Sequence, residues 1–289
     1  MSRTHVGLVC LLSVATGMAF GQTRAAYLEV SKAQVKSDRS KEWEDGVKKL
    51  VDINRRLKGD HWVTLETLYG DSGSFLFSSS RENLAAVESG SDAFMRALKE
   101  GMGPLGDKLM RDLGAYSASF KSEIRRRRWD LSVNAPADTA GMMELVGHSR
   151  FIRTIRMDLK AGRGMEYIEA WKPWQEEIGK VKPAIAALVS ESITGPPALS
   201  VALYYKSMAQ MDADNASIAK ALESSAYRNL MKVSGEALAM TNWEIHRVRP
   251  ELSNPPDEIV KADPAFWKPE PAALTSSKKN SGAADRGKK

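Results

Sequence analysis

Four arginines lie at matching positions in a segment that the chain contains twice. Residues 123–132 read EIRRRRWDLS and residues 244–253 read EIHRVRPELS, so six of the ten positions are identical. The identical positions include Arg126 and Arg128 in the first copy, and Arg247 and Arg249 in the second. Because a guanidinium group donates two parallel hydrogen bonds to a carboxylate or phosphate, the repetition predicts a site for an anionic ligand.

The direction of these side chains follows from the strand that each copy is expected to form. Alternate side chains of a strand point to opposite faces, so the two arginines of a copy share one face. If this face lines a space between two sheets, the four guanidinium groups meet around a pseudo-two-fold axis and need anions nearby. These anions are either a ligand or carboxylates of the chain itself, and the carboxylates on predicted strands are Glu29, Glu66, Asp158 and Glu191.

Aromatic side chains indicate a second property of the ligand. Trp62 and Trp243 lie on or beside predicted strands, where they would line an apolar pocket for a flat molecule. Trp43, Trp171 and Trp174 have helical spacing, which favours a place in the core between helix and sheet. Together with the four arginines and Glu66, Trp62 and Trp243 make up the predicted ligand site.

Histidine is scarce, and no metal site is predicted. The chain has four histidines, and no two of them have the spacing of metal ligands. A single histidine can hold a haem iron, so haem bound through His148 is one alternative, and a surface or linker histidine is the other. No other cofactor is predicted, because the sequence contains no phosphate loop, nucleophile elbow or dinucleotide fingerprint.

The elements that must position these residues also occur twice. Residues 27–30 align with residues 151–154 at an offset of about 124, and strands are predicted at 27–35 and 151–159. Amphipathic helices follow, at 41–57 and 165–180. Each half then continues with two strands and a helical stretch before the closing arginine strand, at 62–69, 74–78 and 82–120, and at 185–193, 199–205 and 208–240.

This order is the ferredoxin-like pattern of strand, helix, strand, strand, helix and strand, with an extra helix before the last strand. We therefore predict an α+β fold in which residues 22–133 and 148–253 are tandem ferredoxin-like repeats, each burying its apolar face against the other. Residues 134–147 are predicted to be a linker. Residues 254–273 are predicted to be an extended proline-rich arm pinned by Phe266 and Trp267, and residues 274–289 a disordered basic tail.

A tandem of two such units resembles the dimeric α+β barrel superfamily over roughly residues 27–253. The resemblance lies in element order and duplication rather than in a motif. It implies two antiparallel sheets that pack face to face around a cavity, with both halves of the pseudo-dimer in one chain. The superfamily contains cofactor-free monooxygenases, haem enzymes and proteins without known activity, so the resemblance implies a fold but not one function.

Residues 1–21 have the pattern of a secretory signal peptide. An apolar run over residues 6–15 precedes Ala19-Phe20-Gly21, which predicts cleavage before Gln22 and a periplasmic or extracellular location. The one cysteine of the sequence, Cys10, lies in this segment, so the exported chain is expected to lack disulfides. No second apolar run in the sequence is long enough to span a membrane.

The formal charge of +6 does not point to a nucleic-acid partner. Removal of Arg3 leaves +5, and residues 274–289 carry +4 of this, so the folded part carries about +1. The basic tail allows weak contact with an anionic polymer or lipid of the cell envelope.

Three functions are consistent with the sequence. The first is an exported protein that binds a small anionic or aromatic ligand between two ferredoxin-like sheets. The second is a cofactor-free or haem-dependent oxidoreductase of the monooxygenase type, which rests on fold analogy and His148. The third is a non-catalytic protein of the cell envelope. The sequence alone does not decide whether a reaction is catalysed.

Overall fold

The computed structural model describes residues 24–268 of the chain. The predicted signal peptide, the predicted basic tail and residues 269–273 of the predicted arm lie outside these residues. Within them, one order of elements runs twice: strand, helix, two strands, two helices and a strand.

The first run consists of β1 (Tyr27–Val35), a 3-10 turn (Ser37–Arg39), α1 (Ser40–Arg56), β2 (Val63–Tyr69), β3 (Ser74–Arg81), α2 (Leu84–Met102), α3 (Pro104–Tyr116) and β4 (Ser117–Arg127). After α4 (Thr139–Gly147), the second run consists of β5 (Phe151–Leu159), α5 (Gly164–Gly179), β6 (Ala187–Ser192), β7 (Ala198–Tyr205), α6 (Met208–Leu222), α7 (Ser225–Ala237) and β8 (Leu238–Val248). A 3-10 turn (Pro250–Leu252), α8 (Asp257–Ala262) and α9 (Pro264–Trp267) follow.

The strands of both runs form one closed antiparallel barrel in the order β1-β3-β2-β8-β5-β7-β6-β4. Strands β1 to β4 make one half of the barrel and β5 to β8 make the other. Two seams join the halves, one between β2 and β8 and one between β4 and β6. The predicted α+β fold with a common interior is confirmed, and closure pairs each of these strands on both sides.

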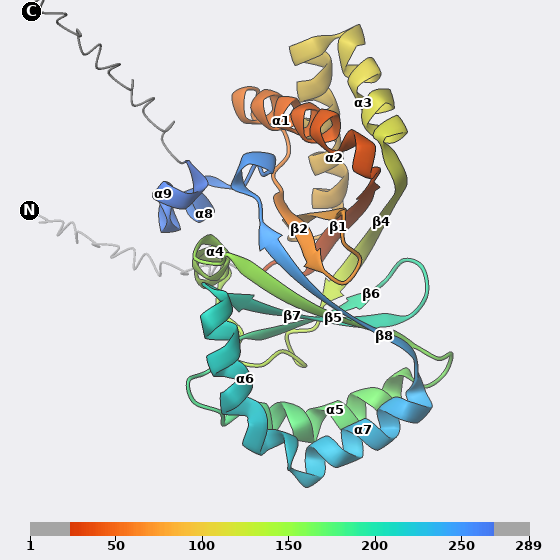
Figure 1. The fold of residues 1–289 in the computed structure, drawn as a ribbon, viewed down its shortest axis with the longest axis vertical. Helices are drawn as coiled ribbons and strands as arrows, with labels where there is room; N and C mark the ends of the chain where they lie inside the picture. Colours follow the sequence, from red (N-terminus) through yellow and green to blue (C-terminus); the bar gives the residue numbers. More distant parts are fainter. Residues whose placement is uncertain (1–23, 269–289) are drawn as a thin grey trace, which may run out of the picture.

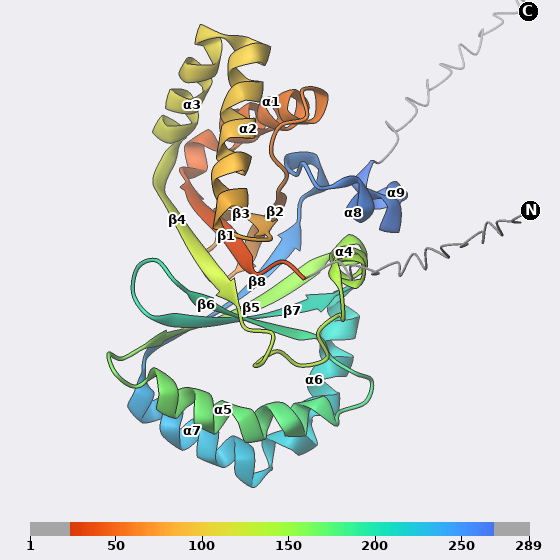
Figure 2. The same ribbon diagram turned by 180° about the vertical axis from the view of Figure 1, so that it is seen from behind.

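Helices cover the outer face of the barrel on two opposite sides, with α1, α2 and α3 on the first half and α5, α6 and α7 on the second (Figure 1). The view from behind shows the same two layers (Figure 2). The spacing of apolar residues explains this packing, because α1 and α5 each bury one face. The buried aromatic residues of these two faces are Trp43, Tyr167, Trp171 and Trp174, which confirms that these tryptophans belong to the core.

Each predicted long helical stretch consists of two helices and ends earlier than expected. Gly103 separates α2 from α3 with a φ of +53°, a backbone conformation that favours glycine. The predicted ends of the helical stretches, residues 117–120 and 238–240, instead begin β4 and β8. Most of the first six residues in each strand are exposed, so no alternation of apolar and polar side chains marks them as strand.

One end of the barrel is covered by α4, α8 and α9 (Figure 1). Trp267 is buried there and donates a hydrogen bond from Nε1 to the carbonyl oxygen of Gly147 at 2.9 Å. The predicted linker thus contains a helix, and the prediction of an extended arm is wrong for the described residues 254–268. Pro256 precedes α8 and Pro264 begins α9, and proline favours a helix start because its φ is already helical.

Candidate functional site

The four repeated arginines lie at the two seams of the barrel. At the first seam, Glu66 of β2 is the register partner of Arg247 of β8. The Glu66 carboxylate accepts hydrogen bonds from Arg247 at 2.6 Å and from Arg249 at 2.8 Å. Arg249 also donates to Glu44 of α1 at 2.8 Å and to Glu251 at 2.6 Å. The first seam is therefore a network in which carboxylates of the chain neutralise both arginines.

The second seam has the same arrangement with the roles of the halves exchanged. Glu191 of β6 is the register partner of Arg126 of β4 and accepts hydrogen bonds from Arg126 at 2.8 Å and Arg128 at 3.2 Å. Arg128 also donates to Asp130 at 2.7 Å. In each half, the two arginines are thus held by a glutamate of the other half.

The structure corrects the expectation that the four guanidinium groups meet inside the barrel. Their face of the strand is the outer one, as the contact of Arg249 with Glu44 on helix α1 shows. Side chains alternate as predicted, but the interior receives the other set of β4, which includes Arg125 and Arg127. Sequence alternation defines two faces, and only the packing of helices decides which of them becomes the interior.

A charged cluster fills one part of the barrel interior. Glu123 forms an ion pair with Arg125 and accepts a hydrogen bond from Arg156 at 3.0 Å, while Arg156 also donates to Asp158 at 2.8 Å. Burial alone would raise the pKa of Glu123, but the charges of Arg125 and Arg156 outweigh it and lower the pKa. Burial also lowers the pKa of the Arg125 guanidinium, because a charged group is poorly solvated there.

His246 occupies the position in β8 that Arg125 has in β4, and it is fully buried. Its Nδ1 lies 3.0 Å from the hydroxyl of Thr67, and its Nε2 lies 2.8 Å from the hydroxyl of Thr154. Burial lowers the pKa of His246 to about 4, so the ring is neutral at pH 7. Both ring nitrogens are occupied by hydrogen bonds, which gives His246 a structural role.

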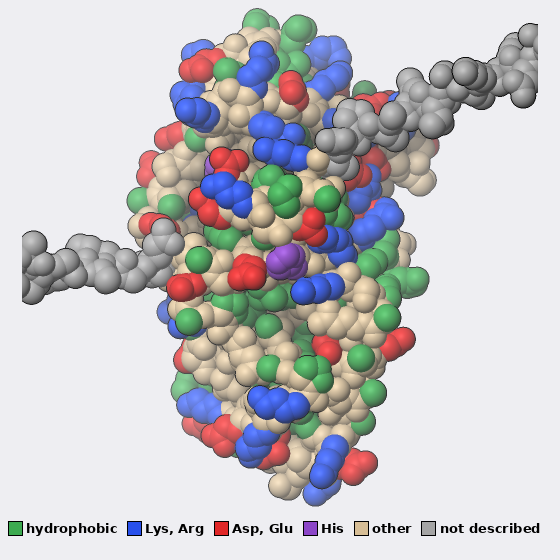
Figure 3. Space-filling model, turned by 90° about the vertical axis from the view of Figure 1, so that its left-hand side faces the viewer, with side chains coloured by type: hydrophobic (Ala, Val, Ile, Leu, Met, Phe, Trp, Pro, Cys, Tyr) green, Lys and Arg blue, Asp and Glu red, His purple; other side chains and the backbone are tan. Residues whose placement is uncertain are grey.

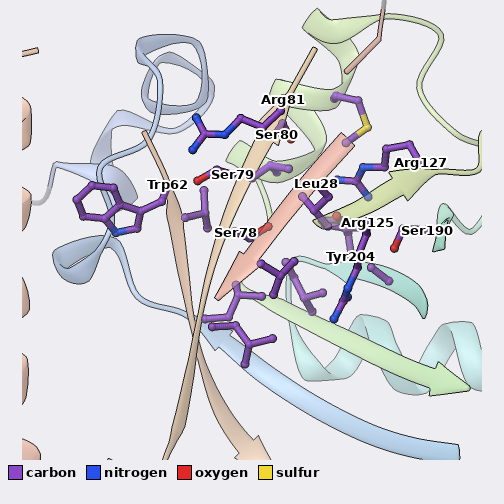
Figure 4. Close-up of a pocket in the computed structure, with 18 of the residues that line it drawn as sticks. Leu28, Trp62, Ser78, Ser79, Ser80, Arg81, Arg125, Arg127, Ser190 and Tyr204 are labelled. Carbon is purple, nitrogen blue, oxygen red and sulfur yellow. The ribbon is translucent and has the colours of Figure 1, made fainter. Parts of the chain in front are cut away.

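The barrel interior contains a partly open cavity of about 220 Å³, called the barrel cavity below. Figure 4 shows Arg125, Arg127 and Ser190 on one side of it, with Trp62 and Arg81 on the other. Its remaining lining includes serine hydroxyls and apolar side chains of β1, β3 and α4. Trp62, a residue of the predicted site, lines this cavity and donates from Nε1 to the carbonyl oxygen of Leu252 at 2.9 Å.

Two further pockets lie between the outer face of the barrel and its helices. The α1/α3 pocket, of about 440 Å³, is lined by residues of the first half, including Arg81 and Met110. The α5/α7 pocket, of about 340 Å³, is lined by residues of the second half, including Arg153 and Met231. The two pockets occupy corresponding places in the two halves, so their differences indicate where a specific ligand would bind.

The principal difference between the pockets is the pairing of their arginines. In the α1/α3 pocket, Arg81 donates to Glu29 at 2.8 Å and to Asp60 at 2.6 Å, so its charge is fully compensated. Arg153 occupies the position in β5 that Glu29 has in β1. It donates to the neutral amide oxygen of Asn215 at 3.0 Å, and its guanidinium carbon lies 4.5 Å from the ring centroid of Trp243.

A buried acid completes the polar part of the α5/α7 pocket. Asp214 is 5% exposed, and burial raises the pKa of its carboxyl group. Burial also raises the pKa of the Tyr205 hydroxyl. The charge of Asp214 adds to this rise, and the charge of Arg153 opposes it. The pocket therefore holds a cation, an acid with raised pKa and a phenol in apolar surroundings, which is typical of functional sites.

Aromatic rings form much of the remaining wall of the α5/α7 pocket. Trp174 and Tyr227 pack with their ring centroids 4.8 Å apart. Trp171 donates from Nε1 to the carbonyl oxygen of Leu131 at 2.9 Å, so its polar atom is satisfied away from the pocket. Trp243, the other predicted tryptophan, lines this pocket and is 53% exposed.

No described histidine lines either the α1/α3 or the α5/α7 pocket. His148 directly follows α4 and lies in a separate depression with Glu144 and Gln210. The linings of the α1/α3 and α5/α7 pockets therefore do not fit a haem held by histidine. Among residues 24–268, no group of three or more His, Cys, Asp or Glu residues is arranged to hold a metal ion.

On the face shown in Figure 3, charged side chains of both signs are mixed. Lysine and arginine side chains lie there among aspartate and glutamate side chains. In the part of the chain that the structure describes, no helix is both long and apolar enough to cross a membrane.

Comparison with known proteins identifies the fold. No protein-family model and no curated protein matches the sequence. An anthrone oxidase-like protein of known structure is similar, with a TM-score of 0.53, 10% identity, and 78% of this chain and 92% of that chain covered. A candidate monooxygenase from Fusobacterium nucleatum has a TM-score of 0.50 and 9% identity, with 78% of this chain and 93% of that chain covered.

A chlorite dismutase from Candidatus Nitrospira defluvii, 10% identical, has a TM-score of 0.47 over 83% of this chain and 95% of that chain. Identities this low show the fold alone. With its closed barrel of two four-stranded halves and a helical layer on each, the chain has the fold of the dimeric α+β barrel superfamily.

Proposed function

We propose that the chain binds a small aromatic ligand with one anionic group in the α5/α7 pocket. The observation that carries this proposal is the pairing of Arg153, whose hydrogen bond goes to the neutral Asn215. The corresponding residue of the first half, Glu29, is instead paired with Arg81. A ligand carboxylate or phenolate at Arg153 would supply the negative charge that Arg81 receives from the protein.

The rest of the α5/α7 pocket favours a flat, apolar ligand body. Its volume of about 340 Å³ accommodates a small organic molecule, and its wall includes Trp171, Trp174 and Tyr227. Aromatic side chains bind flat rings by offset or edge-to-face contact. The proposal thus keeps the anionic or aromatic ligand that the sequence predicts. It places this ligand between sheet and helices, not between the two sheets.

Two expectations from the sequence remain part of this proposal. Residues 1–21 support an exported protein, which would meet its ligand outside the cytoplasm. The repeated order of elements and the repeated arginine segment support an origin of the two halves by duplication. After duplication, the second half would have lost an ion pair like the one between Arg81 and Glu29, and the α5/α7 pocket would then have become available to a ligand.

Binding of 1-naphthoate tests the proposal, with 1-naphthalenemethanol as the uncharged comparison. We expect wild-type protein to bind naphthoate, measured by quenching of tryptophan fluorescence, and Arg153→Met to bind it about 10-fold to 100-fold more weakly. Binding of naphthalenemethanol should change little in this variant. If wild type binds neither compound, or if Arg153→Met weakens both equally, the proposed role of Arg153 is wrong.

A matched pair of variants locates the ligand. Met231 lines the α5/α7 pocket and Met110 lines the α1/α3 pocket, and both residues are partly open to solvent. Met231→Trp should block naphthoate binding by filling the pocket, whereas Met110→Trp should leave it unchanged. Equal effects of the two variants would contradict the assignment to the second half.

The buried Asp214 favours a second candidate function, a cofactor-free oxidation of the monooxygenase type. A desolvated carboxylate can remove a proton from an acidic C–H or O–H group of a bound aromatic molecule, and Arg153 can stabilise the resulting anion. Molecular oxygen would then be the oxidant of this anion. The name of the anthrone oxidase-like relative suggests a probe, since anthrone and O₂ give anthraquinone and water in a balanced reaction.

Anthraquinone formation in air, followed by absorbance, tests this candidate. An active wild type should lose most of its rate in Asp214→Asn, because the amide cannot accept the proton. Asp212→Asn, on the same helix and exposed, is the matched control. A rate equal to that of the buffer alone would reject the oxidation of anthrone while leaving the binding proposal intact.

A further inference from the structure

Arg127 is a buried cation for which the described residues provide no carboxylate partner. The residue is 7% exposed, and its guanidinium carbon lies 5.8 Å from the ring centroid of Trp129. Its Nε atom is buried without a hydrogen-bond partner among residues 24–268. Because an unpaired buried charge is strongly destabilising, a group that compensates Arg127 would stabilise the protein.

The other charges of the barrel interior compensate one another. Arg125 and Arg156 share Glu123, and Arg156 also contacts Asp158. Lys32 lies 2.8 Å from Glu244 and 3.1 Å from Asp71. Among the charged interior groups that the structure describes, Arg127 is therefore the cation left over.

Arg127 lines the barrel cavity together with serine hydroxyl groups (Figure 4). The serines lie on β3, β6 and β7 and are Ser78, Ser79, Ser80, Ser190 and Ser200. The Oγ atom of Ser200 is also buried without a partner in the described chain. A guanidinium group and hydroxyl donors around one cavity can together bind the oxygens of an anion.

Much of the remaining wall of the barrel cavity is apolar, beside Arg81 and Arg125, whose charges are paired within the chain. Its wall includes side chains of β1 and β5 and of the covering helix α4, namely Leu28, Val30, Ile152, Met142, Met143 and Val146. A cavity of about 220 Å³ with such a wall suits a short hydrocarbon body next to the charged head group. One uncompensated positive charge matches a monoanion, whereas a dianionic phosphate would leave one charge buried and unpaired.

We infer that the barrel cavity binds a small carboxylate with a short aliphatic body, whose carboxylate group is held by Arg127 and the cavity serines. This site is separate from the α5/α7 pocket. It lies on the inner face of the barrel, and its cation comes from β4 of the first half rather than from β5 of the second.

Thermal unfolding with sodium hexanoate tests the inference. We expect hexanoate to raise the melting temperature in a saturable way, while hexan-1-ol and sodium chloride at equal ionic strength do not. Arg127→Met should weaken the hexanoate effect at least 10-fold and should itself raise the melting temperature without hexanoate, because it removes an unpaired buried charge. If Arg127 had only a structural role, Arg127→Met would instead lower the melting temperature.

Two control variants make the result specific. Lys121→Met removes an exposed charge from the same strand and should keep the full hexanoate effect. Arg127→Lys keeps the charge without the planar donor group and should show a weaker, measurable effect. No effect of hexanoate on wild type, or an unchanged effect in Arg127→Met, would overturn the inference. A shift with inorganic phosphate and none with hexanoate would overturn the carboxylate assignment.

Testing each ligand on the arginine variant of the other site separates this inference from the proposed function. Arg153→Met should retain the hexanoate effect, and Arg127→Met should retain naphthoate binding. Loss of hexanoate binding in Arg153→Met would contradict a separate site in the barrel. Because each ligand has its own arginine variant, failure of one proposal is distinguishable from failure of the other.

Discussion

Glu66 of β2 lies opposite Arg247 of β8, with its Oε2 2.6 Å from Nη2 of the arginine, and this pair joins the two halves of the chain. Glu191 and Arg126 form the corresponding pair at the other seam, 2.8 Å apart. The repeated arginines are thus placed to hold the barrel closed. Their repetition reflects two equivalent seams.

Replacement of Glu66 should destabilise the barrel. Glu66→Gln removes the shared acceptor charge of Arg247 and Arg249, and Arg249 is largely buried, so we expect a loss of about 1–3 kcal/mol. Glu166→Gln, which breaks an exposed pair with Arg163, is the control and should cost less than about 0.5 kcal/mol. Urea unfolding measures both, and equal losses would show that the seam adds nothing beyond a surface pair.

The same seam predicts a dependence on acid. Burial tends to raise the pKa of Glu66, but hydrogen bonds from Arg247 and Arg249 outweigh it and lower the pKa below 4.5. A lowered pKa in the folded state stabilises the protein above pH 4.5, and this contribution is lost as the pH falls through the folded pKa. Glu66→Gln should therefore differ most from wild type at neutral pH and least in strong acid.

The arginines of the two outer pockets should respond unequally to substitution. Arg81→Met leaves Glu29 and Asp60 with an uncompensated charge and should destabilise the protein by about 3–5 kcal/mol. Arg153→Met breaks a hydrogen bond to a neutral amide and should cost about 1 kcal/mol or less. Equal destabilisation by the two variants would mean that Arg153 is structural, against its proposed role in binding.

Asp214 should reduce stability at neutral pH. Because burial raises its folded pKa above 3.8, the folded state favours the protonated acid, and stability falls as the pH rises through the folded pKa. Asp214→Asn should therefore unfold at a higher temperature than wild type at pH 7, with the difference shrinking near pH 3. The opposite trend, an Asn variant that is less stable at pH 7, would show that the carboxylate is well solvated or paired.

His246 should make the protein sensitive to mild acid. Its folded pKa of about 4 lies below the ordinary 6.5, so the contribution of the neutral ring is lost as the pH falls from 6.5 towards 4. The loss is about 3.5 kcal/mol at most, since each pKa unit corresponds to about 1.4 kcal/mol. His246→Gln should flatten the stability profile over this range, whereas His61→Gln, at an exposed position, should leave its shape unchanged. Identical profiles for wild type and His246→Gln would contradict the assigned burial effect.

Much of the fold could be predicted from the sequence because its signals are local. Alternation at Tyr27–Val35 and Phe151–Leu159 gave both strand boundaries correctly, and the apolar spacing around Trp43 located α1 to within a residue at each end. The starts of β4 and β8 were missed because exposed strand residues lack alternation. The helices around Pro256 and Pro264 were missed because proline composition alone does not separate an extended arm from helix starts.

The site was harder to predict because it depends on contacts between distant segments. Strand alternation correctly placed Arg126 and Arg127 on opposite faces of β4. Only the helical layers show that Arg126 lies outside the barrel and Arg127 inside it. The alignment of Glu29 with Arg153 carried a usable signal, because a change of charge between otherwise similar halves marks a position with a different partner. Asp214 gave no such signal, since its burial arises from the packing of α6 on the barrel.

A crystal structure of the protein with 6-bromo-2-naphthoate tests the central claim most directly, because the anomalous signal of bromine locates the ligand. We predict bromine density in the α5/α7 pocket, between α5, α7 and the outer face of β5 and β7, with the carboxylate within hydrogen-bond distance of Arg153. Bromine density in the α1/α3 pocket, in the barrel cavity or at no defined position would contradict the account.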